Sequence, residues 1–258
     1  MSTSADSFHK DYKPTPRPLW RESFVGLDWL ALHASPVFYG WGVPRGDGSA
    51  VIAVPGFMGT DLYLQELHCW LRRIGYRPYV SNIGRNADCL DLLADRLLQT
   101  IQKAYDETHG VVHLIGHSLG GVLALSAAAL RPDIVASVIT LGSPFRGIRS
   151  HPIVLEMSKV VRQRIRTTRR DETKPACFTG YCDCDAVNAL QIPCPHRIPH
   201  TAIYTKTDGV VDWRVCVNND PATDVEVQST HIGLAFSPWV YEVIANRLSQ
   251  SGSDSWLT

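Results

Sequence analysis

The sequence predicts an α/β fold, in which helices cover both faces of a mostly parallel sheet. Short apolar runs typical of buried strands alternate with segments of helical apolar spacing along most of the chain. In addition, a serine within Gly-x-Ser-x-Gly stands where one such strand passes into one such helix. The 258 residues, of which 45% are hydrophobic, suffice for one large domain over residues 1–258.

The spacing of apolar residues places the individual elements. Strands are expected at residues 50–54, 77–81, from 111 to the serine, and at 134–141, 201–205 and 225–227. Helices are expected at residues 62–74, 90–105, 119–130 and 236–248. The helix after the serine is expected to end before Pro132, because proline cannot continue a helix.

The N-terminal region is expected to add one further helix. Residues 1–20 are mostly polar and contain prolines, which predicts a loosely held tail. Between residues 20 and 34, apolar residues recur at helical spacing, namely Trp20, Phe24, Leu27, Leu30 and Ala31. This pattern predicts a helix that packs onto the main sheet through its apolar side.

The alternation of strands and helices stops after Phe145 and resumes at Thr201. The interruption is first helical and basic, then rich in Pro and Cys. Because a structureless loop of this length is unusual inside a compact domain, we expect an inserted cap over residues 145–200. Ligands of parallel sheets bind beyond the carboxyl ends of the strands, and both flanks of the cap meet that edge.

Composition excludes several functions. Lys+Arg and Asp+Glu number 25 each, so the overall charge attracts neither nucleic acid nor an anionic membrane, and a neutral or small substrate is favoured. No apolar stretch approaches the roughly 18 residues of a membrane span. No signal peptide is visible, which favours a cytoplasmic location, with secretion as the alternative for a longer precursor. The oligomeric state is not indicated.

Ser118 is the candidate nucleophile. It stands in Gly116-His117-Ser118-Leu119-Gly120, and the glycines leave the space that a sharp strand-to-helix turn needs. Such a turn holds the serine strained and accessible at the strand's carboxyl end. His117 is expected to point elsewhere, and His113, inside the strand, is expected to be a buried residue of the core.

A serine hydroxyl needs a base, and the base needs an orienting carboxylate. His231 is the best candidate base, because its loop lies between the last strand and the closing helix, at the same edge as Ser118. Asp208 is the favoured acid, because it leaves the strand at 201–205 first and is followed by Gly209; Asp212 is the competitor. The chain order of serine, acid and histidine is that of α/β-hydrolases.

The reaction also needs an oxyanion hole made of two backbone N–H groups. Leu119, directly after the nucleophile, supplies one. The other is expected from the glycine-containing loop 56–59 after the first strand, with Phe57 as first choice and Met58 as the alternative. A purely structural role for these glycines in a tight connection is the competing interpretation.

These motifs resemble those of serine esterases and lipases of the α/β-hydrolase superfamily, in particular bacterial lipases with a Gly-His-Ser-x-Gly-Gly elbow. The resemblance covers residues 50–248, interrupted by the cap, and rests on residues 55–59, 116–121, 140–147, 208–211 and 231–234. One departure is Pro55, where many relatives carry histidine. The resemblance implies the α/β-hydrolase fold and hydrolysis of carboxylic esters or lipids through an acyl-enzyme, without a cofactor.

Other functions remain open at this point. An acyltransferase or thioesterase would use the same three residues with a different acceptor or acyl group, so the sequence does not separate it from a hydrolase. A catalytically silent binding protein would have no need of intact Ser118, Asp208 and His231.

Two features of the expected cap have alternative interpretations. Its basic residues could bind an anionic group, but a solvated helix face is favoured, since Val154, Leu155, Val160, Val161 and Ile165 supply an apolar side. The basic residues are Lys159, Arg162, Arg164, Arg166, Arg169 and Arg170.

The cysteines form the second feature. Cys177, Cys182, Cys184 and Cys194, followed by His196 and His200, depart from the paired spacing of structural zinc sites, so no metal is expected. Disulfides among these four, with Cys216 as a distant partner, are favoured. Free buried thiols are the alternative, and are expected for Cys69 and Cys89.

Overall fold

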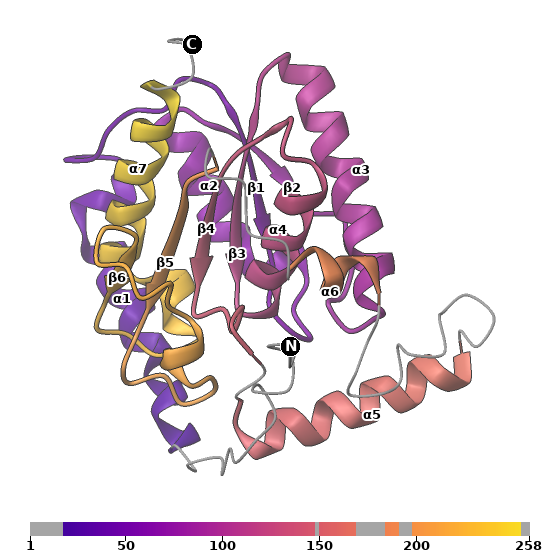
Figure 1. Ribbon diagram of the computed structural model, residues 1–258. Coiled ribbons are helices and arrows are strands. Elements are labelled where there is room, and N and C mark those ends of the chain that lie inside the picture. The colour runs from indigo at the N-terminus through magenta and orange to yellow at the C-terminus, as the bar shows by residue number, and fades with distance from the viewer. Residues whose placement is uncertain (1–17, 148–149, 169–183, 191–197, 254–258) are drawn as a thin grey trace.

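The computed structural model describes residues 18–147, 150–168, 184–190 and 198–253, and within them a six-stranded sheet forms the centre (Figure 1). The strand order is β2-β1-β3-β4-β5-β6, and every pair of neighbours is parallel. The strands are β1 Ala50–Val54, β2 Arg77–Val80, β3 Val112–His117, β4 Val135–Leu141, β5 His200–Tyr204 and β6 Asp224–Glu226.

Helices connect these strands. The α-helices are α1 Val25–Ala34, α2 Gln65–Ile74, α3 Leu90–Thr108, α4 Leu119–Leu130, α5 Pro152–Thr168, α6 Asp185–Ala189 and α7 Pro238–Ser253. Short 3₁₀ helices are η2 Leu19–Phe24, η3 Pro36–Tyr39, η4 Asp61–Leu64, η6 Trp213–Val215 and η7 Gly233–Phe236. The predicted α/β fold with a parallel sheet is therefore confirmed, and most element boundaries differ from the prediction by a few residues or less.

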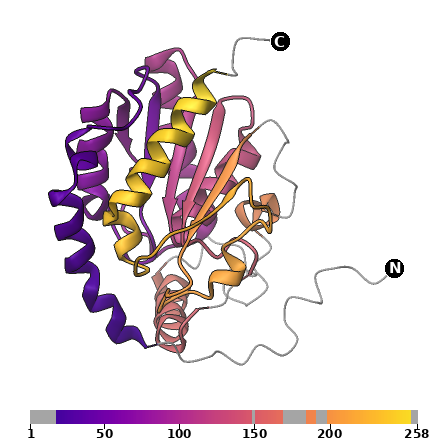
Figure 2. The ribbon, with the colours of Figure 1, turned by 90° about the vertical axis from the view of Figure 1, so that its left-hand side faces the viewer.

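Helices cover both faces of the sheet (Figures 1 and 2), and a hydrophobic cluster lies on each face. One cluster joins the sheet to α3, α4 and α6, and the other joins it to α2 and α7. Within β1, Ile52 belongs to the first cluster and its neighbours Val51 and Ala53 to the second, as the alternation of side chains along a strand requires. The sheet is buried on both sides, which explains its continuous apolar strands.

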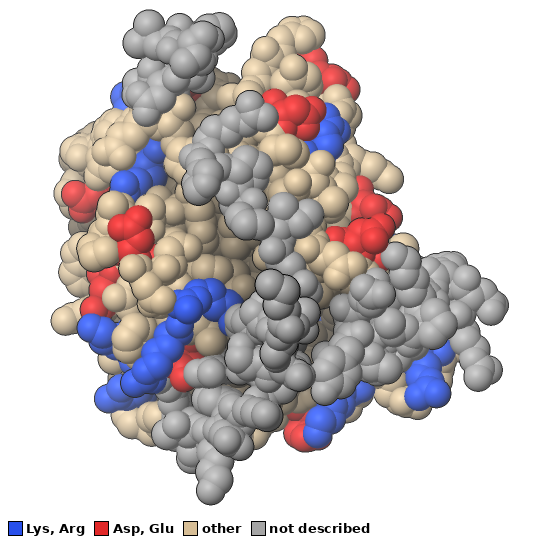
Figure 3. All heavy atoms as spheres, in the orientation of Figure 1, with Lys and Arg blue, Asp and Glu red and all other residues tan. Residues whose placement is uncertain are grey.

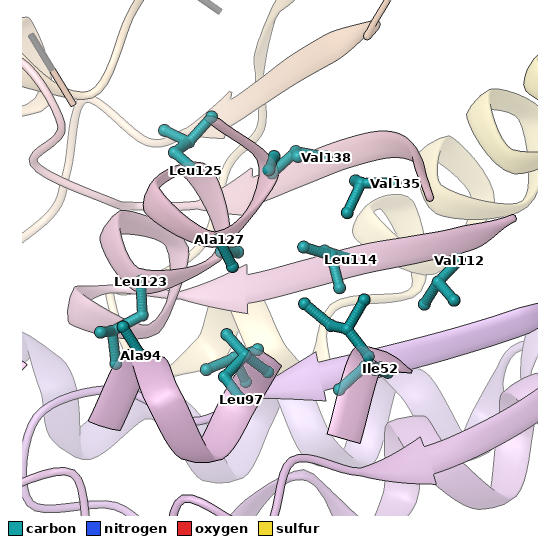
Figure 4. Packing of buried hydrophobic residues seen from close by; sticks show 14 of the residues in the cluster. Ile52, Ala94, Leu97, Val112, Leu114, Leu123, Leu125, Ala127, Val135 and Val138 are labelled. Carbon is teal, nitrogen blue, oxygen red and sulfur yellow. The ribbon is translucent and has the colours of Figure 1, made fainter. Parts of the chain in front are cut away.

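The cluster under α3 and α4 shows how the sheet is covered. Ile52 of β1 and Leu114 of β3 point toward Leu97 of α3, while Val138 of β4 lies on the side of α4 (Figure 4). All four side chains have no solvent exposure. Their burial fixes α4 against the sheet and, with it, the turn between β3 and α4.

The prediction for the N-terminal helix is wrong in its orientation. The segment is helical, as η2 followed by α1, but its apolar stripe is exposed: Trp20 by 63%, Leu27 by 61% and Leu30 by 57%. The side chains that enter the protein are Glu22 and Leu32, which are 8% and 0% exposed. Burial of Glu22 and Leu32, and not of the apolar stripe, therefore anchors the segment, together with polar contacts of Asp28, Trp29 and His33.

The insertion between β4 and β5 contains α5 and α6. The short helix α6 packs on the body of the domain, where the Ser126 hydroxyl of α4 donates to the carbonyl of Ala186 (2.8 Å). The long helix α5 lies beyond the end of the sheet (Figure 1). Residues 148–149, 169–183 and 191–197 lie outside the described part, so a cap over 145–200 stays a proposal.

Charged residues of both signs lie on the surface. On the face seen in Figure 3, acidic and basic side chains are interspersed among wide uncharged areas. Among the helices that the structure describes, none is both long and apolar enough to cross a membrane.

Core packing leads to a first prediction. Leu114→Ala should lower the free energy of unfolding by about 2–5 kcal/mol, because the site lies in the middle of a sheet buried on both faces. Leu62→Ala, at a side chain that is 78% exposed, should change it by no more than about 0.5 kcal/mol. Urea unfolding of both variants provides the measurement, and equal losses would contradict the assigned core.

Candidate active site

Ser118 occupies a strained turn between β3 and α4. Its backbone has φ 52° and ψ −124°, a region that costs a non-glycine residue about 1–3 kcal/mol. The flanking positions must be glycines, because a Cβ on Gly116 would overlap Gly121 and a Cβ on Gly120 would overlap the carbonyl of Val54. The local sequence thus holds the Ser118 side chain at the carboxyl end of β3, where its residue is 9% exposed.

His231 and Asp208 form a buried pair. The distance from Nδ1 of His231 to Oδ2 of Asp208 is 2.7 Å, and the residues are 4% and 1% exposed. Burial alone would lower the pKa of His231, but the charge and hydrogen bond of Asp208, together with the charge of Glu22, raise it above the ordinary value of 6.5. The pair therefore favours the imidazolium that forms when His231 accepts a proton.

The backbone around Asp208 aims its carboxylate. Oδ1 accepts hydrogen bonds from the N–H groups of Val210 (2.8 Å) and Val211 (2.7 Å), which leaves Oδ2 for the histidine. The competing acid, Asp212, serves a different purpose: its Oδ1 accepts the N–H of Arg214 at 3.1 Å and caps η6. The structure brings Asp208, and not Asp212, to His231.

The sheet brings Ser118 to this pair. The N–H of Ser118 donates to the carbonyl of Leu141 at the end of β4 (2.8 Å), and Gly142 follows directly. A Cβ on Gly142 would lie 3.1 Å from Nδ1 of His231 and 3.3 Å from Oδ2 of Asp208. The strand ends of β3 and β4 thus link the elbow to the acid and the base.

The loop after β1 lies against the elbow. A Cβ on Gly56 would stand 3.0 Å from Cβ of Ser118. Within the described residues, the amide of Phe57 donates to no acceptor, whereas the amide of Met58 donates to the carbonyl of Asn86 (2.8 Å). Leu119 begins α4, so its N–H is one of the first-turn donors that lack an intrahelical acceptor. This geometry favours the N–H of Phe57 over that of Met58 as the second oxyanion-hole donor beside the N–H of Leu119.

Two other histidines have structural roles. His113 is 2% exposed and its Nδ1 lies 2.7 Å from the Ser137 hydroxyl, as expected for a residue of the core. The Nε2 of His117 donates to the carbonyl of His231 at 2.9 Å. Burial lowers the pKa of His117 to about 3, so its ring stays neutral. It supports the loop that carries His231, called the histidine loop below.

Known proteins resemble this chain in sequence and in fold. Residues 69–174 match the Esterase family model, described as "Putative esterase". Solved structures of the α/β-hydrolase fold align with most of the chain. A metagenome-derived lipolytic enzyme of the LipS and LipT pair has 14% identity and a TM-score of 0.57, over 82% of this chain and 96% of its own. The metagenomic carboxyl esterase MGS0156 has 14% identity and a TM-score of 0.55, over 98% and 100%.

The chain has the α/β-hydrolase fold.

Its sequence relatives are esterases and lipases. Triacylglycerol lipase of Burkholderia plantarii is 31% identical over 144 residues, which are 52% of this chain and 40% of the lipase. Triacylglycerol lipase of Pseudarthrobacter phenanthrenivorans is 33% identical over 118 residues, which are 42% of this chain and 37% of the lipase. The matched part of the chain thus spans about two fifths of these relatives' length.

The site contains residues that the sequence pattern did not reveal. Asn86 holds the loop after β1 in place: its N–H donates to the carbonyl of Gly59 (2.9 Å) and its side-chain Nδ2 to the carbonyl of Pro55 (2.8 Å). The hydroxyl of Tyr63 donates to the carbonyl of Ile232 (3.1 Å) in the histidine loop. Neither residue belongs to a motif, and only the chain's fold brings them to the site.

The predictions for the cysteines have mixed outcomes. Cys69 is a free thiol, but it is exposed and not buried as expected. Cys89 and Cys184 are buried, and the Sγ of buried Cys216 lies 3.7 Å from the carbonyl of Asp212. Cys177, Cys182 and Cys194 lie outside the described residues, so the disulfides stay a prediction.

Metal-binding and basic residues can be judged in part. Among the described residues, no three His, Cys, Asp or Glu side chains gather as a metal site would require. On α5, Lys159, Arg164 and Arg166 are exposed, as expected for a solvated face, while Val160 of the expected apolar side is 70% exposed and Ile165 is buried. Arg169 and Arg170 lie outside the described residues, and the side chain of Arg162 is not described.

The two aspartates provide a matched test. Asp208→Asn should lower kcat/KM for an ester by about 10⁴-fold, the order of loss typical of this change in a Ser-His-Asp triad. Asp212→Asn keeps an oxygen for the Arg214 amide and should leave kcat/KM close to that of the parent protein. Steady-state kinetics with a chromogenic ester compare the two, and the reverse ranking would reassign the acid.

Proposed function

We propose that this α/β-hydrolase hydrolyses carboxylic esters through a triad of Ser118, His231 and Asp208. The observation that carries the proposal is the buried pair of His231 and Asp208, with Oδ2 2.7 Å from Nδ1, beside a strained serine at the end of β3. The matches to an esterase family and to triacylglycerol lipases support the same chemistry.

The geometry suggests how the reaction proceeds. His231 removes the proton of Ser118, whose oxygen attacks the ester carbonyl and forms a tetrahedral intermediate. Asp208 stabilises the imidazolium, and the amides of Phe57 and Leu119 bind the oxyanion. His231 then protonates the leaving alcohol, the acyl group stays on Ser118, and water releases the acid by the same steps.

The surroundings support an apolar acyl group as part of the substrate. Ser150 forms a bridge with Val211, so α5 begins close to the loop that carries Asp208. Along α5, Ile153, Met157 and Val160 are 55%, 42% and 70% exposed. An apolar helix surface next to the catalytic edge offers a place for an acyl chain to contact, and the lipase names of the relatives agree with it.

Ser118→Ala tests the nucleophile. Without its hydroxyl no acyl-enzyme can form, so hydrolysis of p-nitrophenyl esters should fall by roughly 10⁴-fold or more while the unfolding midpoint stays near that of the parent. Ser126→Ala is the matched control, because this buried serine lies on the same helix and contacts Ala186. Retained hydrolysis in the Ser118 variant, or covalent labelling by a fluorophosphonate at another serine, would remove Ser118 from the mechanism.

A series of p-nitrophenyl esters tests the acyl group. If α5 contacts the chain, kcat/KM should rise from acetate toward longer acyl groups, because each buried methylene contributes about 0.8 kcal/mol at most. Val160→Ser should reduce this preference and leave acetate hydrolysis unchanged. A preference for acetate over all longer esters would argue against an apolar acyl site.

A further inference from the structure

Glu22 is a buried carboxylate with three backbone donors from distant parts of the chain. Its Oε1 accepts the N–H of Gly209 (3.1 Å) and of His231 (3.2 Å), and its Oε2 accepts the N–H of Ile232 (3.0 Å). The glutamate is 8% exposed and comes from η2 near the N-terminus. One side chain thus accepts from donors 187 to 210 residues further along the sequence.

The donors belong to the two loops that carry the acid and the base. Gly209 follows Asp208 directly, and the N–H of His231 is the backbone of the proposed base itself. The Glu22 carboxylate lies close to the backbone of Gly209, since a Cβ on Gly209 would lie 2.9 Å from Oε1 of Glu22. A carboxylate that only stabilised the fold could accept from any amides, whereas this one links the two loops whose separation sets the Asp208 to His231 hydrogen bond.

The charge of Glu22 also acts on His231. Among the described residues, the ionisable groups that contact the His231 ring or its loop include, besides Asp208, His117, Tyr63, Asp28 and Glu22. Burial lowers the pKa of His117 to about 3 and raises that of Tyr63, so both are neutral near pH 7. Asp28, half buried, lies within 3.4 Å of the Thr230 hydroxyl. Glu22 is thus a second carboxylate beside the base, held in place by three amides.

We propose that Glu22 is a positioning residue of the catalytic site, which holds the Asp208 and His231 loops in register through their amides and favours the protonated imidazole. The inference rests on the proposed ester hydrolysis. Glu22 does not contact the substrate; it acts through the base. Its effect should therefore be on kcat and on the pH dependence, and not on substrate binding.

Glu22→Gln is the decisive variant. Glutamine keeps the size and one acceptor oxygen, but loses the charge and turns an N–H₂ group toward one amide. We expect kcat to fall about 10- to 100-fold, with KM within about twofold, because a small shift of the base has a large cost. The acidic limb of the kcat/KM profile should move to lower pH, since the charge of Glu22 raises the pKa of His231.

Glu66→Gln is the matched control. Glu66 also binds the N-terminal helix, through the Trp29 indole (3.0 Å) and His33 (3.4 Å), but it contacts neither catalytic loop. Its kcat and pH profile should equal those of the parent protein. If the Glu22→Gln variant does not fold, Glu22→Asp keeps the charge on a shorter side chain, and it should lower kcat without moving the acidic limb.

An NMR titration of the His231 ring, assigned by comparison with a His231→Gln variant, separates this inference from the proposed function. A lower pKa in Glu22→Gln supports the role of Glu22 even when no ester is hydrolysed or when Ser118→Ala stays active, outcomes that reject only the proposed function. An unchanged His231 pKa, together with unchanged kcat, would overturn the inference and leave Glu22 as a structural carboxylate.

Discussion

The buried contact between Asp208 and His231 is the interaction on which the rest of the site depends. Both residues are almost fully buried. Burial of a charged group costs several kcal/mol unless the remaining polar atoms of that group form hydrogen bonds. Oδ1 of Asp208, the oxygen that does not contact His231, accepts hydrogen bonds from two backbone amides, those of Val210 and Val211. The same hydrogen bonds that stabilise the carboxylate therefore determine how the loop after β5 turns, and the direction in which Oδ2 points.

The histidine loop needs the same support from several elements. Three of its carbonyls accept hydrogen bonds from other elements. Tyr63 donates to the carbonyl of Ile232, and His117 donates to that of His231. The hydroxyl of Thr205 donates to the carbonyl of Ser229 (2.9 Å). These donors come from η4, from the end of β3 and from the end of β5. Because the carboxyl ends of parallel strands meet at one edge, a loop at that edge can be fixed from several sides. The position of His231 is thus determined by the whole edge of the sheet and not by its own loop alone.

The sequence was sufficient for features that depend on near neighbours. Apolar runs located the strands, and the helix at 119–130 was predicted at the residues where it is found. The chain order of Ser118, Asp208 and His231 followed from motifs at strand ends, because the topology of a parallel sheet places those ends together. Asn86 and Tyr63 could not be found in this way. Their partners lie 31 and 169 residues away, and no local pattern records such a contact.

The N-terminal segment shows where a local pattern is overruled. Its apolar spacing favours burial of Trp20, Phe24 and Leu27, each worth about 1.5–3 kcal/mol if fully buried. The structure instead buries Glu22, although a carboxylate is among the side chains least often found inside a protein. The reversal is stable because three amides compensate the carboxylate, and those amides would otherwise be buried beside it without an acceptor. The orientation of the helix is therefore determined by the buried amides of the Asp208 and His231 loops, which require an acceptor. The acidic Glu22 inside an apolar helical pattern is the one local sign of this orientation. The sequence pattern does not show what Glu22 binds, because its partners are backbone amides next to Asp208 and at His231.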